Sequence, residues 1–226
     1  MLEQVSIIRQ KRQTIKITIQ DNGELVVYSP YGVKYDKIEQ ILREKKPLLD
    51  KKIASIKQNS SRFAKIIKKE AILLFGREYL IVPTAKFKKA CFSEEYFLVP
   101  KKYFEESKTN FIIKKSIKEI AERVILRRMH DILTYYKNYE VSKIILGSFK
   151  AKWGSCDNFS VIKLNWKLAM LPQKLVDFVL FHELTHLKEL NHSKNFYYEL
   201  SKVCPNWKNC REELKNYSFV LSLYDE

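Results

Sequence analysis

Apolar residues in the first part of the chain recur with two different periods. Over residues 5–28 they alternate with polar residues, and Asp-Asn-Gly at 21–23 interrupts the alternation. This pattern is typical of strands joined by a tight turn, so we expect a β-meander. Over residues 38–56 the spacing becomes helical, with Pro47 inside the stretch. The pattern predicts one helix marked by a break at Pro47, or two helices in succession.

Short apolar segments followed by one long periodic stretch fill the middle of the chain. Residues 78–83, 86–92 and 96–100 are strand candidates. We therefore expect residues 1–100 to form a mainly β module with one helical excursion. From about residue 103 to 136, apolar residues recur at helical spacing with Lys and Arg on the other side. This stretch predicts a long amphipathic helix.

The last part of the chain mixes strand and helix signals. Residues 143–149 and 160–165 favour strands, and the sequence WGSC lies between them at 153–156. A helix is expected to open at Pro172, because proline suits the first turn of a helix. We therefore expect an α+β fold whose second domain, residues 101–226, places this helix beside a small sheet.

Composition and length narrow the class of protein. The chain has 226 residues, of which 46% are hydrophobic and 30% charged, as in soluble globular proteins, and this excludes a disordered or collagen-like chain. The longest apolar run, residues 71–75, is far shorter than a membrane span. The N-terminus MLEQVSIIRQKR carries charges where a signal peptide is apolar. These features predict a cytoplasmic protein that does not enter a membrane.

Cysteine spacing and net charge add two further expectations. The four cysteines have no metal-knuckle spacing and are too few for a disulfide-stapled fold, so we expect free thiols that are mostly buried. The 42 Lys and Arg against 26 Asp and Glu give a net charge of +16. Such a charge attracts polyanions and makes nucleic acid a candidate partner. Lysines scattered over solvated faces explain the same charge, and the chain has no RRM, KH or zinc-finger signature.

Three of the four histidines lie within eleven consecutive residues, in the stretch FHELTHLKELNHS. His182 and His186 are four residues apart on the helix expected after Pro172, so they project side by side about one turn apart. Neutral imidazoles in this arrangement are typical zinc ligands, and a catalytic zinc site takes three protein ligands and leaves one position for water. Glu183 can reach that water as a general base. The residues predict a zinc site for hydrolysis of amide bonds.

The third ligand has three candidates. On a continued helix His192 would lie about 9 Å beyond His186 and on another face, so the helix must end before it. Asn191 tolerates the left-handed conformation that ends helices and could turn His192 back. Glu199, from the next helix, and Glu189 are the alternatives, and we favour His192.

Four other residues have a simpler structural interpretation. Cys156 could bind zinc through its thiolate, but three imidazoles suffice, so we expect a buried thiol. Trp153 and Trp166 are expected to anchor the core, although either could stack on a substrate. His130 is expected at the surface or half-buried on the long helix.

Several short motifs occur together in a fixed order. They are WGSC at 153–156, IKLNW at 162–166, LP at 171–172, HELTHLKELNHSKNF at 182–196 and CPNW at 204–207. This combination resembles the YgjP-like family of metal-dependent hydrolases, relatives of SprT-type and other HExxH metallopeptidases. The segment LFGREY and the order of the predicted elements extend the resemblance loosely over the whole chain.

The resemblance implies a zincin-like metallopeptidase domain with an HExxH active-site helix. It implies that His182, His186 and His192 bind zinc and that Glu183 is the catalytic acid and base. The chain departs from the family pattern at Lys152, where an arginine is expected, and in the aromatic pair at 196–197, which is Phe-Tyr instead of Phe-Trp.

The leading function is therefore a zinc-dependent metallopeptidase that acts on a peptide or protein substrate. We expect an edge strand, with residues 160–165 as the candidate, to align an extended peptide by backbone hydrogen bonds. The alternative is a basic nucleic-acid-associated protein with a zinc site, which could proteolyse DNA-bound proteins as SprT relatives do. Glu183 argues against a purely structural zinc site, which would have four closed ligands.

Overall fold

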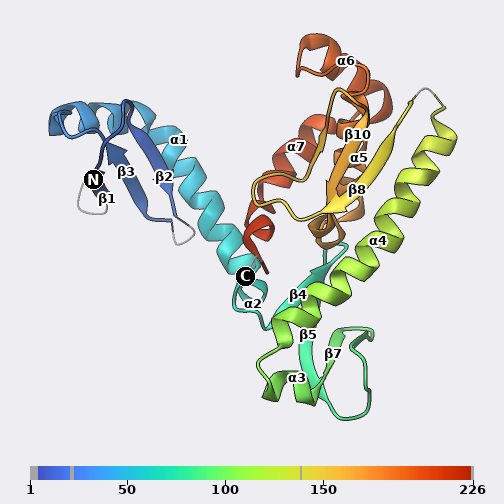
Figure 1. Ribbon diagram of the computed structural model, residues 1–226. Helices are drawn as coiled ribbons and strands as arrows, with labels where there is room; N and C mark the ends of the chain where they lie inside the picture. Colours follow the sequence, from blue (N-terminus) through green and yellow to red (C-terminus); the bar gives the residue numbers. More distant parts are fainter. Residues whose placement is uncertain (1–4, 21–22, 138, 225–226) are drawn as a thin grey trace. The chain divides into compact units, whose positions relative to one another are not determined.

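The chain divides into two compact units, residues 1–64 and 65–226 (Figure 1). The computed structural model describes residues 5–20, 23–137 and 139–224. The predicted domain boundary near residue 100 falls inside the second unit, because residues 71–100 form a sheet that belongs to it. Because this division into compact units does not by itself define domains, the domain boundary near residue 100 stays a prediction.

The first unit is a three-stranded sheet with one long helix. Its elements are β1 (Val5–Arg9), β2 (Lys16–Ile19), β3 (Leu25–Ser29) and α1 (Tyr35–Arg62). The strand order is β1-β3-β2, with β1 parallel and β2 antiparallel to β3. The expected β-meander is therefore wrong, because β1 and β2 both pair with β3 and not with each other. The continuous apolar run of β3, with Val26 and Val27 buried, suits the central position.

The turn and the helix of this unit follow the sequence pattern in part. β2 and β3 are joined at Gly23, whose φ of 86° lies in the left-handed region that favours glycine. Asp21 and Asn22 of the predicted turn lie outside the described residues. α1 runs through Pro47 as a single helix without a break into two. Pro47 is exposed, so water can satisfy the carbonyl group of Arg43 that the proline cannot bond.

A four-stranded sheet opens the second unit, after the short helix α2 (Ala64–Ile67). Its strands are β4 (Ala71–Leu74), β5 (Arg77–Thr84), β6 (Cys91–Phe92) and β7 (Tyr96–Pro100), in the order β4-β5-β7-β6. β5 and β7 match the predicted strands, whereas the strand expected over residues 86–92 contracts to β6. The sequence pattern does not predict β4, because its buried residues form a continuous apolar run with no strand alternation.

The predicted long helix is present as α4, but it begins later than the sequence pattern indicates. α3 (Lys101–Glu105) is followed by α4 (Thr109–Tyr135), and the chain between them passes through Ser107 at a φ of 54°. This left-handed residue ends α3 and redirects the chain into α4. The buried stripe of α4 includes Ile113, Ile117 and Ile125, as the helical spacing predicts.

A third sheet and the C-terminal helices complete the second unit. The sheet has the order β8-β10-β9, formed by β8 (Lys143–Gly147), β9 (Gly154–Cys156) and β10 (Val161–Asn165). The helical elements that follow are η2 (Trp166–Met170), α5 (Gln173–Thr185), α6 (Lys194–Val203), α7 (Trp207–Lys215) and η3 (Ser218–Ser222). β10 pairs on both sides, so the expectation that residues 160–165 form an edge strand is wrong.

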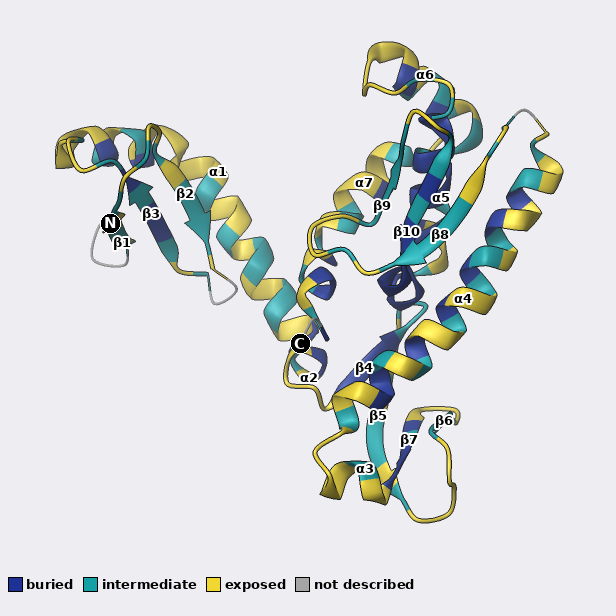
Figure 2. Cartoon of the chain, in the orientation of Figure 1, coloured by how far each residue is buried: buried dark blue, intermediate teal, exposed yellow. Residues whose placement is uncertain are grey.

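Burial explains why β10 is central and β9 is at the edge. Ile162 and Leu164 of β10 are fully buried, and most residues of α5 are buried (Figure 2). β9 is shorter, carries Gly154, and packs beside α5. Helix α5 therefore belongs to the buried core of the second unit.

Among the described residues, no helix is long and apolar enough to cross a bilayer.

Candidate metal centre

Helix α5 carries the first two histidines and the glutamate between them. Pro172 precedes its first turn, as expected, and accepts hydrogen bonds from the N–H groups of Leu175 and Val176. The helix ends at Thr185, and His186 is its C-terminal capping residue. His182 is half-buried and His186 is 9% exposed, so α5 brings both imidazoles to the margin of the core.

The structure brings His182, His186 and His192 together. One ligand nitrogen from each lies within 4.8 Å of the other two, an arrangement that could hold a metal ion. The Nε2 atoms of His182 and His192 are 2.9 Å apart. The ring of His186 lies 5.0 Å from that of His182 and 4.7 Å from that of His192, measured between centroids. The three imidazoles therefore converge on one point, as the spacing of the first two predicts.

His186 has one nitrogen committed to the backbone. Its Nδ1 lies 3.0 Å from the carbonyl oxygen of Glu189, and because a carbonyl can only accept, Nδ1 must carry the proton. This fixes the ring orientation, and in the neutral ring Nε2 is then the nitrogen that can bind a metal ion. Metal-binding histidines typically donate their other ring N–H in this way.

The route by which His192 returns to the cluster differs from the expectation. α5 ends at Thr185, and the next turn closes through N–H groups of Leu187, Lys188 and Glu189, which donate to carbonyl groups of Leu184 and Thr185. Asn191 is not in the left-handed region, so the prediction that it terminates the helix is wrong. The chain leaves the helix earlier because the turn that caps His186 already satisfies the final carbonyl groups.

Helix α6 holds His192 in place from the other side. Its N-cap is Ser193, whose hydroxyl oxygen accepts the backbone N–H of Phe196 at 3.2 Å. His192 immediately precedes this cap, so the start of α6 fixes the position of its backbone. Phe196 is fully buried, and its ring centroid lies 4.6–5.0 Å from those of the three imidazoles. The motif NHSKNF thus supplies a histidine, a cap and an apolar wall in six residues.

The two alternative third ligands face other partners. Glu199 forms ion pairs with Lys188, at 3.5 Å, and with Lys202. The hydrogen bond from Lys202, foremost, lowers the pKa of Glu199. Glu189 accepts a hydrogen bond from the Asn195 side chain. Neither carboxylate joins the histidine cluster.

The environment keeps His182 and His192 uncharged. Burial lowers the pKa of His182 to about 3, and the neighbouring His186 and His192 act in the same direction. Burial also lowers the pKa of His192. Both imidazoles are therefore neutral near pH 7 and have a free lone pair, which is the form that binds a metal ion.

Glu183 is a buried carboxyl group beside this cluster. It is 5% exposed, and burial raises its pKa to about 8, although Lys152 partly opposes the shift. Gly154 of β9 packs directly against it: a β-carbon at position 154 would lie 2.7 Å from Oε1 of Glu183. Only glycine leaves room for the carboxyl group at this approach. Sequence reasoning did not identify Gly154, although a glycine inside a strand signals a close approach of this kind.

Asn165 holds the loop that leads into β9 at Gly154. Its fully buried side-chain amide donates to the carbonyl groups of Phe149, at 2.8 Å, and Lys152, at 3.0 Å. Its backbone N–H donates to the carbonyl group of Trp153 at 2.8 Å. The motifs IKLNW and WGSC therefore act together, because the asparagine of one positions the glycine of the other.

Aromatic residues behind His192 form a second feature that the sequence did not reveal. Tyr197 stacks on Trp207 with centroids 4.4 Å apart, and Arg211 donates to the Tyr197 hydroxyl at 3.2 Å. The ring centroid of Tyr197 is 6.3 Å from that of His192. This group supports the exposed side of the cluster.

The remaining candidate residues stay outside the cluster. All four cysteines are free as expected, but only Cys210 is buried, so the expectation that most are buried is wrong. Burial, and next the charge of Glu183, raises the pKa of Cys156 to about 11, which keeps it a thiol. Trp166 is buried and Trp153 half-buried, consistent with core roles, and His130 is exposed.

Three imidazoles around one point, with a buried carboxyl group beside them, are typical of metal-dependent hydrolases. The chain belongs to this class, and its family is specific: residues 13–217 match the YgjP-like family, metallopeptidase domain, so the protein is a YgjP-like metallopeptidase. The resemblance seen in the motifs and the expected α+β fold are thereby confirmed.

Comparisons with individual proteins add one solved structure. None of the curated proteins matches the chain. The crystal structure of the metallopeptidase zymogen of abylysin from Pyrococcus abyssi shares 25% sequence identity, covering 42% of this chain and 90% of that chain, with a TM-score of 0.33.

Proposed function

We propose that this metallopeptidase is a zinc enzyme that hydrolyses peptide bonds, with His182, His186 and His192 as zinc ligands and Glu183 as the general base. The observation that carries the proposal is the convergence of three imidazole nitrogens within 4.8 Å of one another beside a buried glutamate.

The donor set fits zinc and a catalytic role. Zinc binds imidazole nitrogen readily, and three protein ligands leave a fourth position open, whereas structural zinc sites have four closed ligands. Within the described part of the chain, no fourth His, Cys, Asp or Glu joins the cluster. When bound, zinc acidifies a water molecule and polarises the carbonyl group of the scissile bond.

Glu183 has the properties of a proton carrier. Its burial favours the protonated form, and the positive charge of a bound ion would favour the carboxylate, so the two effects bring its pKa toward neutrality. A carboxyl group poised in this way accepts a proton from the attacking water. It then delivers that proton to the nitrogen of the leaving amine.

Strand β9 is the candidate platform for the substrate. It is an edge strand of its sheet, it packs beside α5, and its Gly154 contacts Glu183. We propose that an extended peptide pairs with β9, in place of the strand at 160–165 predicted from the sequence. Backbone pairing at this edge would bring a peptide bond next to Glu183 with little dependence on side chains.

The first prediction tests the role of Glu183. Glu183→Gln keeps the size of the side chain but cannot accept a proton, so hydrolysis should fall by roughly 10²–10⁴-fold while bound zinc stays near one equivalent. Cleavage can be followed by mass spectrometry with an unbiased peptide library, and zinc by elemental analysis. Glu199→Gln, which alters a carboxylate outside the cluster, is the matched control and should retain activity.

Two results would contradict the proposal. Full cleavage by zinc-loaded Glu183→Gln protein would show that another group is the base. A wild-type protein that binds no divalent metal at micromolar concentration would reject the site itself. The alternative of a nucleic-acid-associated protein with a structural zinc site is less well supported, because the three-histidine cluster leaves a ligand position open.

A further inference from the structure

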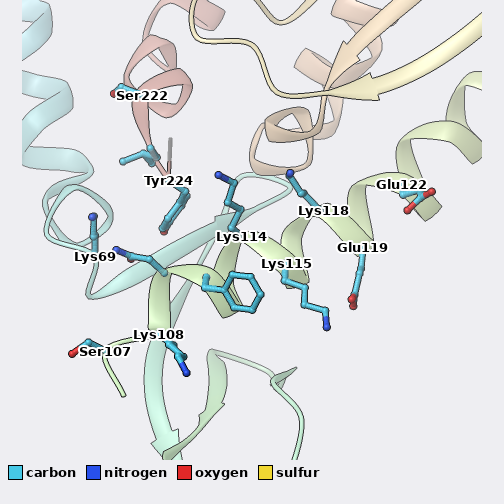
Figure 3. A pocket seen from close by; sticks show the side chains of 13 residues that line it. Lys69, Ser107, Lys108, Lys114, Lys115, Lys118, Glu119, Glu122, Ser222 and Tyr224 are labelled. Carbon is cyan, nitrogen blue, oxygen red and sulfur yellow. The ribbon is translucent and has the colours of Figure 1, made fainter. Parts of the chain in front are cut away.

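A second concave site lies in the 65–226 unit and shares no residue with the histidine cluster. It is a cavity of about 760 Å³. It is lined by the first half of α4, the turn that precedes α4, Lys69, and the chain from Ser222, the last residue of η3, to Tyr224 (Figure 3). Its volume is in the range of ligand pockets, and exposed residues such as Phe111 line it.

Lysine side chains dominate this cavity. Five lysines line it, namely Lys69, Lys108, Lys114, Lys115 and Lys118, against two glutamates, Glu119 and Glu122. In Figure 3 both glutamates lie at one side, away from Tyr224. The spacing of 114, 115 and 118 puts three of the lysines on neighbouring positions of one helix. The lysine-lined part of the cavity therefore has a positive potential.

Most of these ammonium groups lack a carboxylate partner. Lys108 pairs with Glu106 at 2.9 Å, and Lys118 lies over the ring of Trp166. Lys69, Lys114 and Lys115 form no ion pair with any residue that the structure describes. Like charges gathered with few counter-charges among the described residues repel one another, so an anionic ligand would be favoured here.

Two aromatic residues complete the cavity. Phe111 lines it and is 61% exposed, so its ring is accessible to a ligand. Tyr224 is 5% exposed, and its hydroxyl has no hydrogen-bond partner within the described chain. Figure 3 shows Tyr224 between Lys69 and Lys114. A buried hydroxyl without a partner is costly, so this group points to a ligand that would accept its hydrogen bond.

We propose that this cavity binds single-stranded nucleic acid. Phosphate groups would contact Lys69, Lys114 and Lys115, and the Tyr224 hydroxyl would donate to a phosphate oxygen. A base would stack on Phe111, since base-on-aromatic stacking beside cationic groups is typical of single-strand binding. An acidic peptide would form ion pairs with the lysines, but it would not require the exposed ring of Phe111.

The surroundings of the cavity favour a linear ligand. A second groove adjoins it through Lys118 and Glu122 and follows α4 to strand β8. The two hollows share these lining residues and lie next to each other on one helix. A short single strand of nucleic acid could extend from one to the other, whereas a compact phosphate ligand would fill only the lysine-lined part.

The test compares two lysine pairs in the full-length protein. The Lys114→Gln/Lys115→Gln variant removes two charges inside the cavity, and Lys88→Gln/Lys89→Gln removes two from exposed positions outside it. Binding of a fluorescein-labelled oligo(dT) is measured by fluorescence anisotropy across a range of salt concentrations. We expect the cavity variant to bind roughly tenfold or more weakly, with its log–log salt slope reduced by about 1.4, because single strands lose about 0.7 per phosphate contact. The control variant should bind nearly as the wild type does.

Phe111→Ala tests the stacking contact without a change of charge. It should weaken binding by roughly tenfold, and Phe111→Trp should restore it, with an unchanged salt slope in both variants. Equal losses in the two lysine pairs would overturn the proposal in favour of diffuse charge. An unaffected Phe111→Ala variant, together with displacement of the oligonucleotide by poly-glutamate, would overturn it in favour of an acidic protein segment. Zinc content and peptide cleavage in these variants should match wild type, so the result is independent of the proposed peptidase mechanism.

Discussion

The ring of His186 shows what a single residue can and cannot reveal in advance. Its spacing from His182 predicts that both imidazoles share one helix face, and the structure confirms this. Its second hydrogen bond, to the carbonyl oxygen of Glu189, has no sequence signal, because every residue has a carbonyl group. Gly154 is a similar case: its role follows from its approach to Glu183, which only the packing of β9 on α5 reveals.

The choice of third ligand gives a prediction at this scale. His192→Ala should lower zinc affinity by more than the roughly 10–100-fold that follows loss of a hydrogen bond to a ligand, because it removes a ligand itself. Glu199→Ala should leave zinc affinity nearly unchanged, since Glu199 pairs with Lys188 and Lys202. Competition with a zinc-sensitive chelating dye measures both. A structure of the zinc-bound protein with Glu199 on the metal would reject the assignment.

At the scale of elements, local patterns are predictable and pairings are not. α5, β7 and β10 lie where the apolar periodicity predicts them, because a single segment determines its own period. The order β1-β3-β2 and the central place of β10 depend on segments far apart in the chain, so no local pattern gives them. The break between α3 and α4 depends on the left-handed Ser107, a conformation that serine rarely adopts.

The N-terminus of α6 couples an element to the site. Ser193 caps this helix, and His192 precedes it directly. Ser193→Ala should therefore destabilise the protein by about 1 kcal/mol, the usual cost of losing an N-cap, and should also weaken zinc binding. Ser193→Asp, which can cap equally well, should restore both properties. Urea denaturation and zinc titration of the three proteins separate this coupling from a role of Ser193 in helix stability alone, which would leave zinc affinity unchanged.

At the scale of the whole molecule, the site lowers the stability of the zinc-free folded protein. The fold buries a carboxyl group and lowers the pKa of His182 and His192 in one small region. In the unfolded chain the histidines bind protons below about pH 6.5, so their burial lowers stability as the pH falls below that value. Glu183 acts in the opposite direction, and a bound metal ion would relieve part of its cost by favouring the carboxylate.

The last prediction isolates Glu183 through its pH dependence. The unfolded protein releases the Glu183 proton near pH 4.5 and the zinc-free folded protein near pH 8. Between these values the folded state binds more protons, so its stability falls as the pH rises. Glu183→Gln has no such proton, so we expect its stability advantage over wild type to grow between pH 5 and pH 8, by roughly a few kcal/mol. Urea denaturation with a zinc chelator present measures the difference at each pH, and contributions of the histidines cancel because both proteins share them. Glu199→Gln should show no such trend over this range, since the pKa of Glu199 is lowered. A constant difference between wild type and Glu183→Gln would mean that Glu183 is already ionised at pH 5 in the folded protein, contrary to the effect of its burial.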